Sequence, residues 1–249
     1  MTEPTRLLFF AAVFALGGFV KGVVGLVLPT IAMGLLSVLM LPAQAAALLV
    51  VPSLVTNLWQ IGGSGLFALL KRLATLLLGV CAGAWIGAGW LAGSGSSPAT
   101  LGLGAALIAY ATLGLLKWRL RVEPSHEAWL APWVGLATGL VTAATGVFVI
   151  PAVPYLQALG MEKEELVRAL GISFLVSTIA LAATLGSSGS LQATALAGSV
   201  LALLPALLGM GAGQWLRLRV RPETFKTIFF CGLLALGAYL AIRSLIHPG

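Results

Sequence analysis

The amino-acid sequence predicts an all-α polytopic membrane protein, and three observations support that class. Of the 249 residues, 59% are hydrophobic and only 8% are charged, and the mean hydropathy is +1.06. A soluble domain carries about 25% charged residues, because its surface must face water. Apolar runs such as 73–93 have membrane-spanning length and lack the apolar–polar alternation of barrel strands. Since lipid admits only helices and closed barrels, the chain is expected to be helical.

Eight hydrophobic regions follow one another along the chain, separated by polar, charged or glycine-rich breaks. Two of them, 7–40 and 127–159, are longer than the roughly 20 residues that one crossing needs. Glycines, prolines or polar residues interrupt both, so we expect each to form a broken hairpin. The other six have the length of single transmembrane helices and cover 43–62, 70–92, 98–117, 166–186, 191–216 and 223–246.

The two long regions resemble each other, which predicts an internal repeat. The segment "GFVKGVVGLVLP" (18–29) aligns with "GLVTAATGVFVIP" (139–151), which places Lys21 opposite Thr142. Further along, "GAGW" (87–90) matches "GAGQW" (211–215) in the same order and at a similar offset. A shared order and offset indicate two copies of one unit. We place the first repeat at 1–122 and the second at 123–249.

Charged loops predict that the two repeats have opposite orientations in the membrane. In the first repeat, Lys71 and Arg72 mark the loop after the second span, whereas the next loop (93–98) carries no charge. In the second repeat the pattern is reversed, because the loop at 186–190 is uncharged and the loop at 217–226 is basic. Loops rich in Lys and Arg face the cytoplasm, so corresponding loops lie on opposite sides.

This orientation determines the path of the two long regions. We expect the loops 66–72, 117–126 and 217–226 all to be cytoplasmic. Region 127–159 must then enter and leave on one side, and by symmetry 7–40 does the same. The predicted architecture is two inverted-topology repeats, each a broken or re-entrant helical hairpin followed by three transmembrane helices.

Inverted repeats with broken helices at equivalent positions are typical of secondary transporters, which bind substrate between the repeats. A break exposes backbone N–H groups whose partial positive charge can hold an anion. Glycine and proline favour a break in each repeat: Gly18, Gly22, Gly25 and Pro29 in the first, and Gly139, Gly146, Pro151 and Pro154 in the second. The alternative for each glycine is close helix packing, which is also expected of the stripe formed by Gly79, Gly83 and Gly87.

Lys21 stands inside an apolar run, where a lysine near the bilayer centre costs about 2.5–3.5 kcal/mol on insertion scales. No Asp or Glu lies in the interior of a predicted span, so we expect Lys21 to face a polar cavity and an external anion. The alternative is that Lys21 lies near a helix end and extends to the interface.

Polar side chains within the spans supply further candidate anion ligands, because hydroxyl and amide groups donate hydrogen bonds to oxyanions. The alternative for Ser and Thr is a hydrogen bond to a carbonyl of their own helix. Besides Lys21, Gly22, Gly25 and Gly146, the predicted binding residues are Asn57, Gln60, Thr142, Thr145, Ser173 and Ser177.

Several function classes lack the residues that they need. The two histidines, His126 and His247, lie in a loop and beside the C-terminus, so an intramembrane metalloenzyme or Ser–His hydrolase is not expected. No P-loop occurs that would bind a nucleotide. The net charge of +7 fits the positive-inside rule better than nucleic-acid binding. We expect no catalytic residue, metal or cofactor; the partners are a small anion and the lipid bilayer, and a homodimer stays open.

The paired glycine-rich segments that end near a proline resemble those of the sulfite exporter TauE/SafE family, also described as the 4-toluene sulfonate uptake permease family. Residues 18–57 carry the likeness most clearly, and 139–178 carry the second copy. The resemblance implies transport of sulfur-containing oxyanions or organosulfonates, such as sulfite or sulfoacetate. The chain departs from the family at Lys21, where small residues are common, and at "GLVLP", where many members have consecutive glycines.

We therefore predict a secondary transporter that exports small anions across the cytoplasmic membrane as a multi-pass protein. With a negative interior, the membrane potential favours anion exit by about 2.3 kcal/mol per charge per 100 mV, so export needs no coupling ion. The alternatives are an anion-selective channel and an uptake permease for another oxyanion or a carboxylate.

Overall fold

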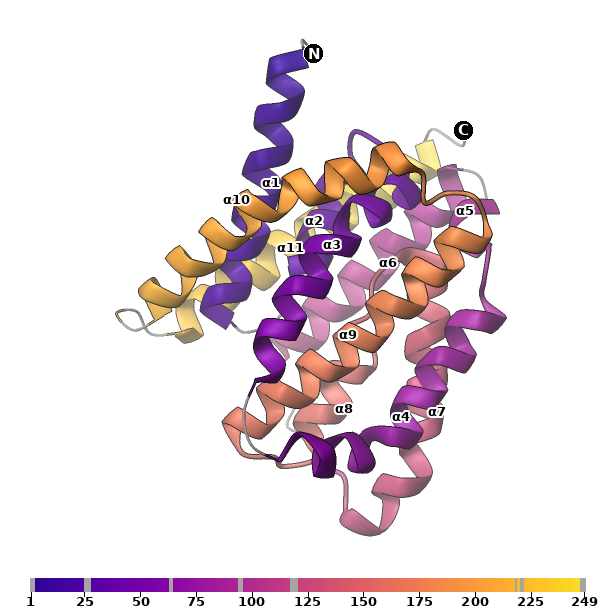
Figure 1. The fold of residues 1–249 in the computed structure, drawn as a ribbon, viewed down its shortest axis with the longest axis vertical. Helices are drawn as coiled ribbons and strands as arrows, with labels where there is room; N and C mark the ends of the chain where they lie inside the picture. The colour runs from indigo at the N-terminus through magenta and orange to yellow at the C-terminus, as the bar shows by residue number, and fades with distance from the viewer. Residues whose placement is uncertain are drawn as a thin grey trace.

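The computed structural model describes residues 3–24, 28–62, 65–93, 96–116, 121–217, 219 and 222–246, and within these ranges the regular structure is entirely helical. The helices cross the molecule at varied angles and pack side by side (Figure 1). In chain order they are α1 (Glu3–Val24), α2 (Leu28–Leu36), α3 (Pro42–Ile61), α4 (Leu66–Ile86), α5 (Trp90–Gly93), α6 (Ser96–Leu115), α7 (Pro124–Thr145), α8 (Ala152–Ala158), α9 (Lys163–Ser187), α10 (Ala193–Arg217) and α11 (Pro222–Ile246).

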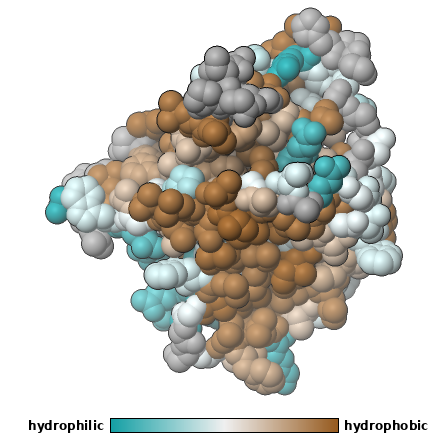
Figure 2. Space-filling model, turned by 45° about the horizontal axis from the view of Figure 1, so that its top comes forward, coloured by the Kyte–Doolittle hydropathy of each residue, from teal (hydrophilic) through white to brown (hydrophobic). Residues whose placement is uncertain are grey.

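Eight helices among the described residues are long and apolar enough to cross a membrane, namely α1, α3, α4, α6, α7, α9, α10 and α11. Their outward faces carry large apolar side chains, including Phe67, Trp85 and Leu201, which are at least three-quarters exposed. Figure 2 shows a broad hydrophobic surface on one face of the molecule, with hydrophilic residues near its margins. A surface of this kind is suited to lipid rather than water, which confirms the all-α polytopic membrane fold.

The second long region forms two helices with a break between them. Helix α7 ends at Thr145, and Gly146 follows in the left-handed conformation with φ of +71°. The Gly146 N–H donates to the Thr142 carbonyl at 2.8 Å, which closes the last turn of α7. Glycine adopts this conformation without the steric cost that a Cβ imposes. Helix α8 then begins at Ala152, directly after Pro151.

The first long region also forms two helices, α1 and α2, and Pro29 is the second residue of α2. Gly25 falls between them and lies outside the described residues. Gly18, Gly22 and Gly139 differ from the expectation that they help to break a helix, because α1 continues through the first two to Val24 and α7 continues through the third to Thr145. The Gly22 Cα instead faces α10, since an added Cβ would lie 2.3 Å from the Met210 carbonyl oxygen.

Helices α1 and α10 contact each other backbone to backbone through four glycines. A Cβ built on any of them would lie within 2.3 Å of a carbonyl oxygen on the other helix, closer than real Cβ atoms approach. Helices α4 and α7 meet in the same way, and Gly79 and Gly83 of the predicted packing stripe contribute to that contact. The glycines are Gly18, Gly22, Gly209 and Gly213 for the first pair, and Gly79, Gly83, Gly135 and Gly139 for the second.

The pattern of helix packing is compatible with two repeats. The repeat alignment matches α1, α2, α3, α4 and α6 with α7, α8, α9, α10 and α11. Exchanging the two sets converts the α1–α10 pair into the α7–α4 pair, and both pairs are extensive. The same exchange maps the α3–α9 and α6–α11 pairs onto themselves. A two-fold axis between the repeats would produce this pattern, and the inverted topology stays a prediction.

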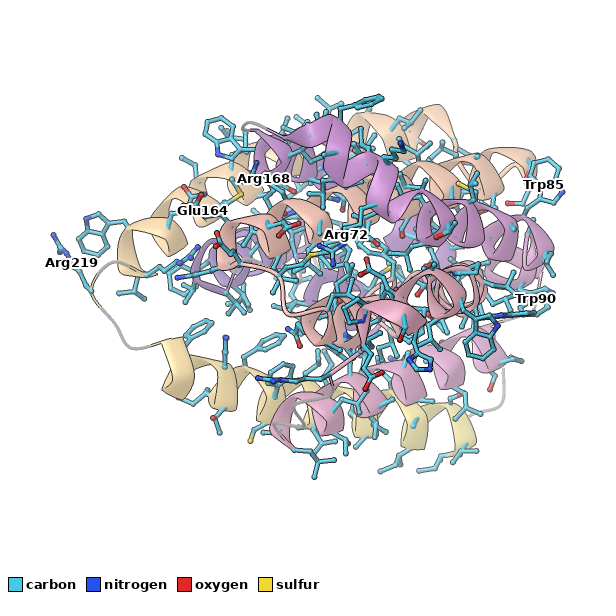
Figure 3. The ribbon with its side chains drawn as sticks, turned by 90° about the horizontal axis from the view of Figure 1, so that it is seen from below. Arg72, Trp85, Trp90, Glu164, Arg168 and Arg219 are labelled. Carbon is cyan, nitrogen blue, oxygen red and sulfur yellow. The ribbon has the colours of Figure 1, made fainter. Side chains whose placement is uncertain are left out.

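The two ends of the helices differ in their side chains. Figure 3 shows Glu164, Arg168 and Arg219 toward one end, and Trp85 and Trp90 toward the other. We call the end that carries Glu164, Arg168 and Arg219 the basic end, and the other the opposite end.

At the basic end, one arginine links the starts of three helices. Arg72 on α4 makes a two-pronged contact with Glu127 on α7, with Nε–Oε1 and Nη2–Oε2 distances of 2.7 and 2.9 Å. Its Nη1 also donates to Glu165 on α9 at 3.2 Å. The Val122 N–H donates to the Ala158 carbonyl at 3.0 Å, so α8 ends beside the start of α7. Region 127–159 therefore begins and ends at the same end of the molecule.

At the opposite end, the turn after α2 meets the start of α6 and the end of α11. The hydroxyls of Ser97 and Ser244 each donate to the other residue's carbonyl, at 3.0 and 2.6 Å. Arg243 Nη1 donates to the Val38 carbonyl at 2.6 Å, so the turn after α2 lies beside the last turn of α11. The first broken region thus leaves at the end of the molecule opposite to the second.

Candidate functional site

Lys21 lies in the last turn of α1, and its side chain points into the protein interior. It is only 2% exposed, and its Nζ donates to Thr56 Oγ1 at 3.0 Å and to Asn57 Oδ1. Both acceptors are neutral side chains on α3. None of the ion pairs among the described residues involves Lys21. The ammonium group therefore does not extend to the interface, and its charge is balanced by two dipoles rather than by a carboxylate.

Helix α3 holds these two acceptors in place through its internal proline. The Thr56 hydroxyl donates to the Pro52 carbonyl at 2.6 Å, so its lone pairs are available to the ammonium group of Lys21. Pro52 lacks an N–H, which leaves the Leu48 carbonyl without its usual helical donor. Ser199 on α10 donates its hydroxyl to that carbonyl at 2.8 Å, and this contact ties α3 to α10.

Four buried hydrogen-bonding groups of α3 and α9 have no partner among the described residues. Each belongs to a side chain that is at most 1% exposed, and the two helices pack against each other. The amide of Asn57 uses its oxygen for Lys21, so its NH₂ group remains unbonded. An unpaired buried polar group costs about 1–3 kcal/mol, which marks this layer as a place for a polar ligand. The groups are Ser53 Oγ, Asn57 Nδ2, Ser173 Oγ and Ser177 Oγ.

A small cavity lies beside this polar layer and joins the two breaks. Pro29 at the start of α2 and Gly146 after α7 both line it, together with Ser53 and Thr178 from α3 and α9. Its volume of about 10 Å³ is close to the minimum that accommodates one water molecule. An oxyanion needs more space than this cavity offers, so the cavity is closed to a ligand of that size in this conformation.

The two threonines of the second break bond within their own helix. Thr142 donates to the Thr138 carbonyl and Thr145 to the Val141 carbonyl, each at 2.7 Å. Thr145 Oγ1 also accepts from the Val147 N–H at 3.2 Å, which caps the first residue after the break. Both hydroxyls thus follow the alternative expected of Ser and Thr in helices.

Gln60, the remaining predicted residue, lies on α3 one turn beyond the Lys21 contact. A Cβ added to Gly171 of α9 would lie 3.1 Å from the Gln60 Cβ. Gln60 is therefore part of the α3–α9 contact, at the side nearer the end of α3.

The sequence prediction did not include Ser53 and Thr56 among the site residues. A signal for Ser53 was present, because Ser53 and Asn57 are separated by four residues just as Ser173 and Ser177 are. Residues four apart share one helix face, so the spacing is enough to indicate a polar stripe in both repeats. No comparable signal indicated Thr56, whose role depends on the register between α1 and α3.

The fold and this site define a multi-pass membrane protein of the transporter class, with helices broken in both halves and a buried cation held between α1 and α3. The chain belongs to the sulfite exporter TauE/SafE family, whose model matches residues 9–240. No curated protein and no solved structure matches the chain. The family match confirms the resemblance seen in the glycine-rich segments and identifies the chain as a membrane transporter.

Proposed function

We propose that the protein exports a small sulfur-containing anion, sulfite or an organosulfonate such as sulfoacetate, across the cytoplasmic membrane. The observation that carries this proposal is the buried ammonium group of Lys21, which has no carboxylate partner among the described residues and contacts α3 beside unpaired donors of α3 and α9. A buried charge without an ionic partner is costly, and an anionic substrate would remove that cost.

The donor set matches the chemistry of a sulfonate or sulfite group. Such a group presents several oxygen acceptors around one sulfur atom. Lys21 would supply the charge-assisted hydrogen bond, and Asn57 Nδ2 would add an amide donor from the same site. Hydroxyl donors from Ser53, Ser173 and Ser177 would bond the remaining oxygens. For the anion to bind, Lys21 must exchange Thr56 and Asn57 Oδ1 for substrate oxygens.

The closed cavity favours a carrier over a channel. In a carrier the substrate site opens to one side at a time, and inverted repeats achieve this by rocking against each other. The α1–α10 and α7–α4 pairs are equivalent when the two predicted repeats are interchanged, and this symmetry supports such a motion. The two broken hairpins would then open the site alternately toward the basic end and the opposite end.

The direction of transport follows from the orientation that we propose. Arg72, Arg168 and Arg219 lie toward the basic end, and Arg243 lies at the opposite end, so under the positive-inside rule the excess of arginine at the basic end favours the cytoplasm for that end. A negative interior then favours movement of the anion toward the opposite end.

Transport in proteoliposomes tests the substrate and the mechanism together. Vesicles loaded with labelled sulfite should release it with saturable kinetics, and external organosulfonates should compete or exchange. Sulfate and simple carboxylates are the comparison substrates. A linear, non-saturating flux without counterflow would indicate a channel, and selective carboxylate transport would refute the sulfur-anion assignment.

Single cysteines test the orientation. In a variant whose Cys81 and Cys231 are replaced by alanine, Leu39→Cys reports on the opposite end and Arg219→Cys on the basic end. An impermeant maleimide added outside intact cells should label position 39 and leave position 219 unmodified. The reverse pattern would overturn the export direction.

A further inference from the structure

Another cavity, with several polar side chains in its walls, lies at the opposite end of the molecule. It lies at the far end of α2 from the break that follows Lys21. Its volume is about 400 Å³, and the turn after α2, the start of α6 and the end of α11 form its walls. The helix α2 joins the two cavities, because Pro29 and Met33 line the small one and Ser37, just after the helix, lines the large one. We call the large cavity the vestibule.

Three kinds of donor converge on the vestibule. Arg243 lines it and uses only Nη1 for a bond to the described residues, so most of its N–H groups are available. Ser97 lines it from the first turn of α6, where the N–H groups of Ser97 and Ala99 lack acceptors within the helix and favour anions, and Thr100 lines it from the start of the next turn. Ser37 is only 6% exposed, and its hydroxyl has no hydrogen-bond partner among the described residues.

The charge and rigidity of the walls also suit an anion. The lining residues include Arg243 and no Asp or Glu, so the only formal charge among them is positive. The reciprocal bonds between Ser97 and Ser244 hold α6 and α11 together on one side. The Arg243 bond to Val38 holds the turn after α2 on the other side. These contacts would preserve the donor positions when the vestibule is empty.

We propose that the vestibule is a second anion site, which takes a small soluble oxyanion such as a sulfonate on Arg243, Ser37 and the first turn of α6. As an anion site it stands on its own geometry. A role as a transient substrate-binding site on the transport path rests on the proposed transport function. A guanidinium group matches the planar edge of two sulfonate oxygens, which gives this site a different selectivity from the ammonium group of Lys21.

Equilibrium binding of labelled methanesulfonate to purified full-length protein in nanodiscs of neutral phosphatidylcholine tests the proposal. Wild type should bind two equivalents per chain, Lys21→Met one, Arg243→Gln one and the double variant none. Arg219→Gln removes the same charge at the basic end and should retain both equivalents. Ser37→Ala should weaken the vestibule equivalent about two- to tenfold without unfolding, because it removes one neutral hydrogen bond.

The outcomes separate this proposal from the transport proposal. Loss of an equivalent in Lys21→Met but not in Arg243→Gln overturns the vestibule site alone. If Arg243→Gln loses one bound equivalent and Lys21→Met still binds two, the vestibule site is supported and the central site is overturned. If Arg243→Gln fails to fold, Arg243→Lys keeps the charge and should retain two equivalents with altered selectivity between sulfonates. Nanodiscs with phosphatidylglycerol test lipid as the source: if anionic lipid removes the Arg243-dependent equivalent, the site takes a lipid phosphate and the soluble-oxyanion proposal is wrong.

Discussion

Lys21 and Thr142 are aligned in the repeat that the sequence predicts, yet their side chains make different contacts. Lys21 reaches from α1 to Thr56 and Asn57 on α3, whereas Thr142 bonds a carbonyl of its own helix α7. The residues that align with Thr56 and Asn57 are Val176 and Ser177, so the second repeat keeps one hydroxyl acceptor where the first has two acceptors.

The glycine contacts between helices, unlike the Lys21 site, are found in both predicted repeats. Gly18 against α10 and Gly139 against α4 are aligned positions, and both place a glycine Cα against a carbonyl oxygen. The comparison separates two roles of a duplicated fold. Helix packing needs matching shapes and occurs in both halves, whereas the buried cation is present in the first half only.

The largest expected effect concerns the packing that the repeats share. Gly18→Ala and Gly139→Ala would place a Cβ 2.0 and 2.2 Å from a carbonyl oxygen, and these backbone atoms cannot move away cheaply. Overpacking costs about 1–3 kcal/mol and sometimes more, so both variants should lower Tm strongly and to a similar extent. Thermal unfolding in detergent is the measurement.

Two other glycines provide matched controls for this prediction. Gly211 on α10 and Gly232 on α11 have open space where a Cβ would lie, so alanine should be neutral there or slightly stabilising. If Gly139→Ala were tolerated and Gly18→Ala were not, the two packing contacts would not be equivalent.

The next effect concerns the charge that the repeats do not share. Lys21→Met should reduce anion efflux about tenfold or more, because a hydrogen bond to a charged group contributes about 1.5–3 kcal/mol. Folding should be preserved, since the change removes a buried cation without leaving a buried carboxylate unpaired. Lys21→Arg should retain part of the flux with altered selectivity. Efflux from proteoliposomes is compared at equal protein incorporation.

The control for this variant is Lys71→Met, which removes an exposed lysine outside the site and should transport as wild type does. Thr142→Met tests the corresponding position and should cost less flux than Lys21→Met. Equal losses from the two would show that both repeats bind the anion in the same way, contrary to the asymmetry described above.

Much of the fold was predictable, because hydropathy reports directly on contact with lipid. The spans, their order and the interruption of both long regions match the observed helices. The helix ends were less accurate: α4 begins at Leu66 rather than near 70, and α9 at Lys163 rather than near 166. Charged residues continue α9 beyond its apolar core, and Glu164 and Glu165 favour its N-terminus through the helix dipole, whereas α4 is extended by the apolar residues Leu66 to Leu69. Hydropathy alone does not detect a charged extension.

The site was predictable only in part. The aberrant position of Lys21 in an apolar run was visible, whereas its partner Thr56 depends on how α1 packs against α3. Gly22 illustrates a second difficulty, because glycine suits both a helix break and a close helix contact. The sequence contains both possibilities, and only the position of Met210 on α10 decides for packing.

A smaller effect is expected at the polar stripe on α3 and α9. Ser173→Ala and Ser53→Ala each remove one unpaired hydroxyl at corresponding positions. Each should reduce transport by about two- to tenfold, because a neutral hydrogen bond to the anion contributes about 0.5–1.5 kcal/mol. Stability should be unchanged or slightly higher, since a buried unpaired group is lost. Apparent affinity for sulfite and Tm are measured for both variants, and a decrease in Tm with unchanged affinity would mean that the hydroxyls serve packing.

The smallest effect distinguishes the two ends of the molecule. Glu127→Gln weakens the ion pair with Arg72 at the basic end, whose arginine side chain is 36% exposed. Exposed pairs contribute about 0.2–1 kcal/mol, so the loss of Tm should be slight, and it should shrink further at high salt. Ser97→Ala at the opposite end removes a neutral contact to Ser244, and its effect on Tm should not depend on salt. Thermal unfolding of both variants at low and high ionic strength makes the comparison, and equal salt dependence would contradict the contrast between an ionic and a neutral end.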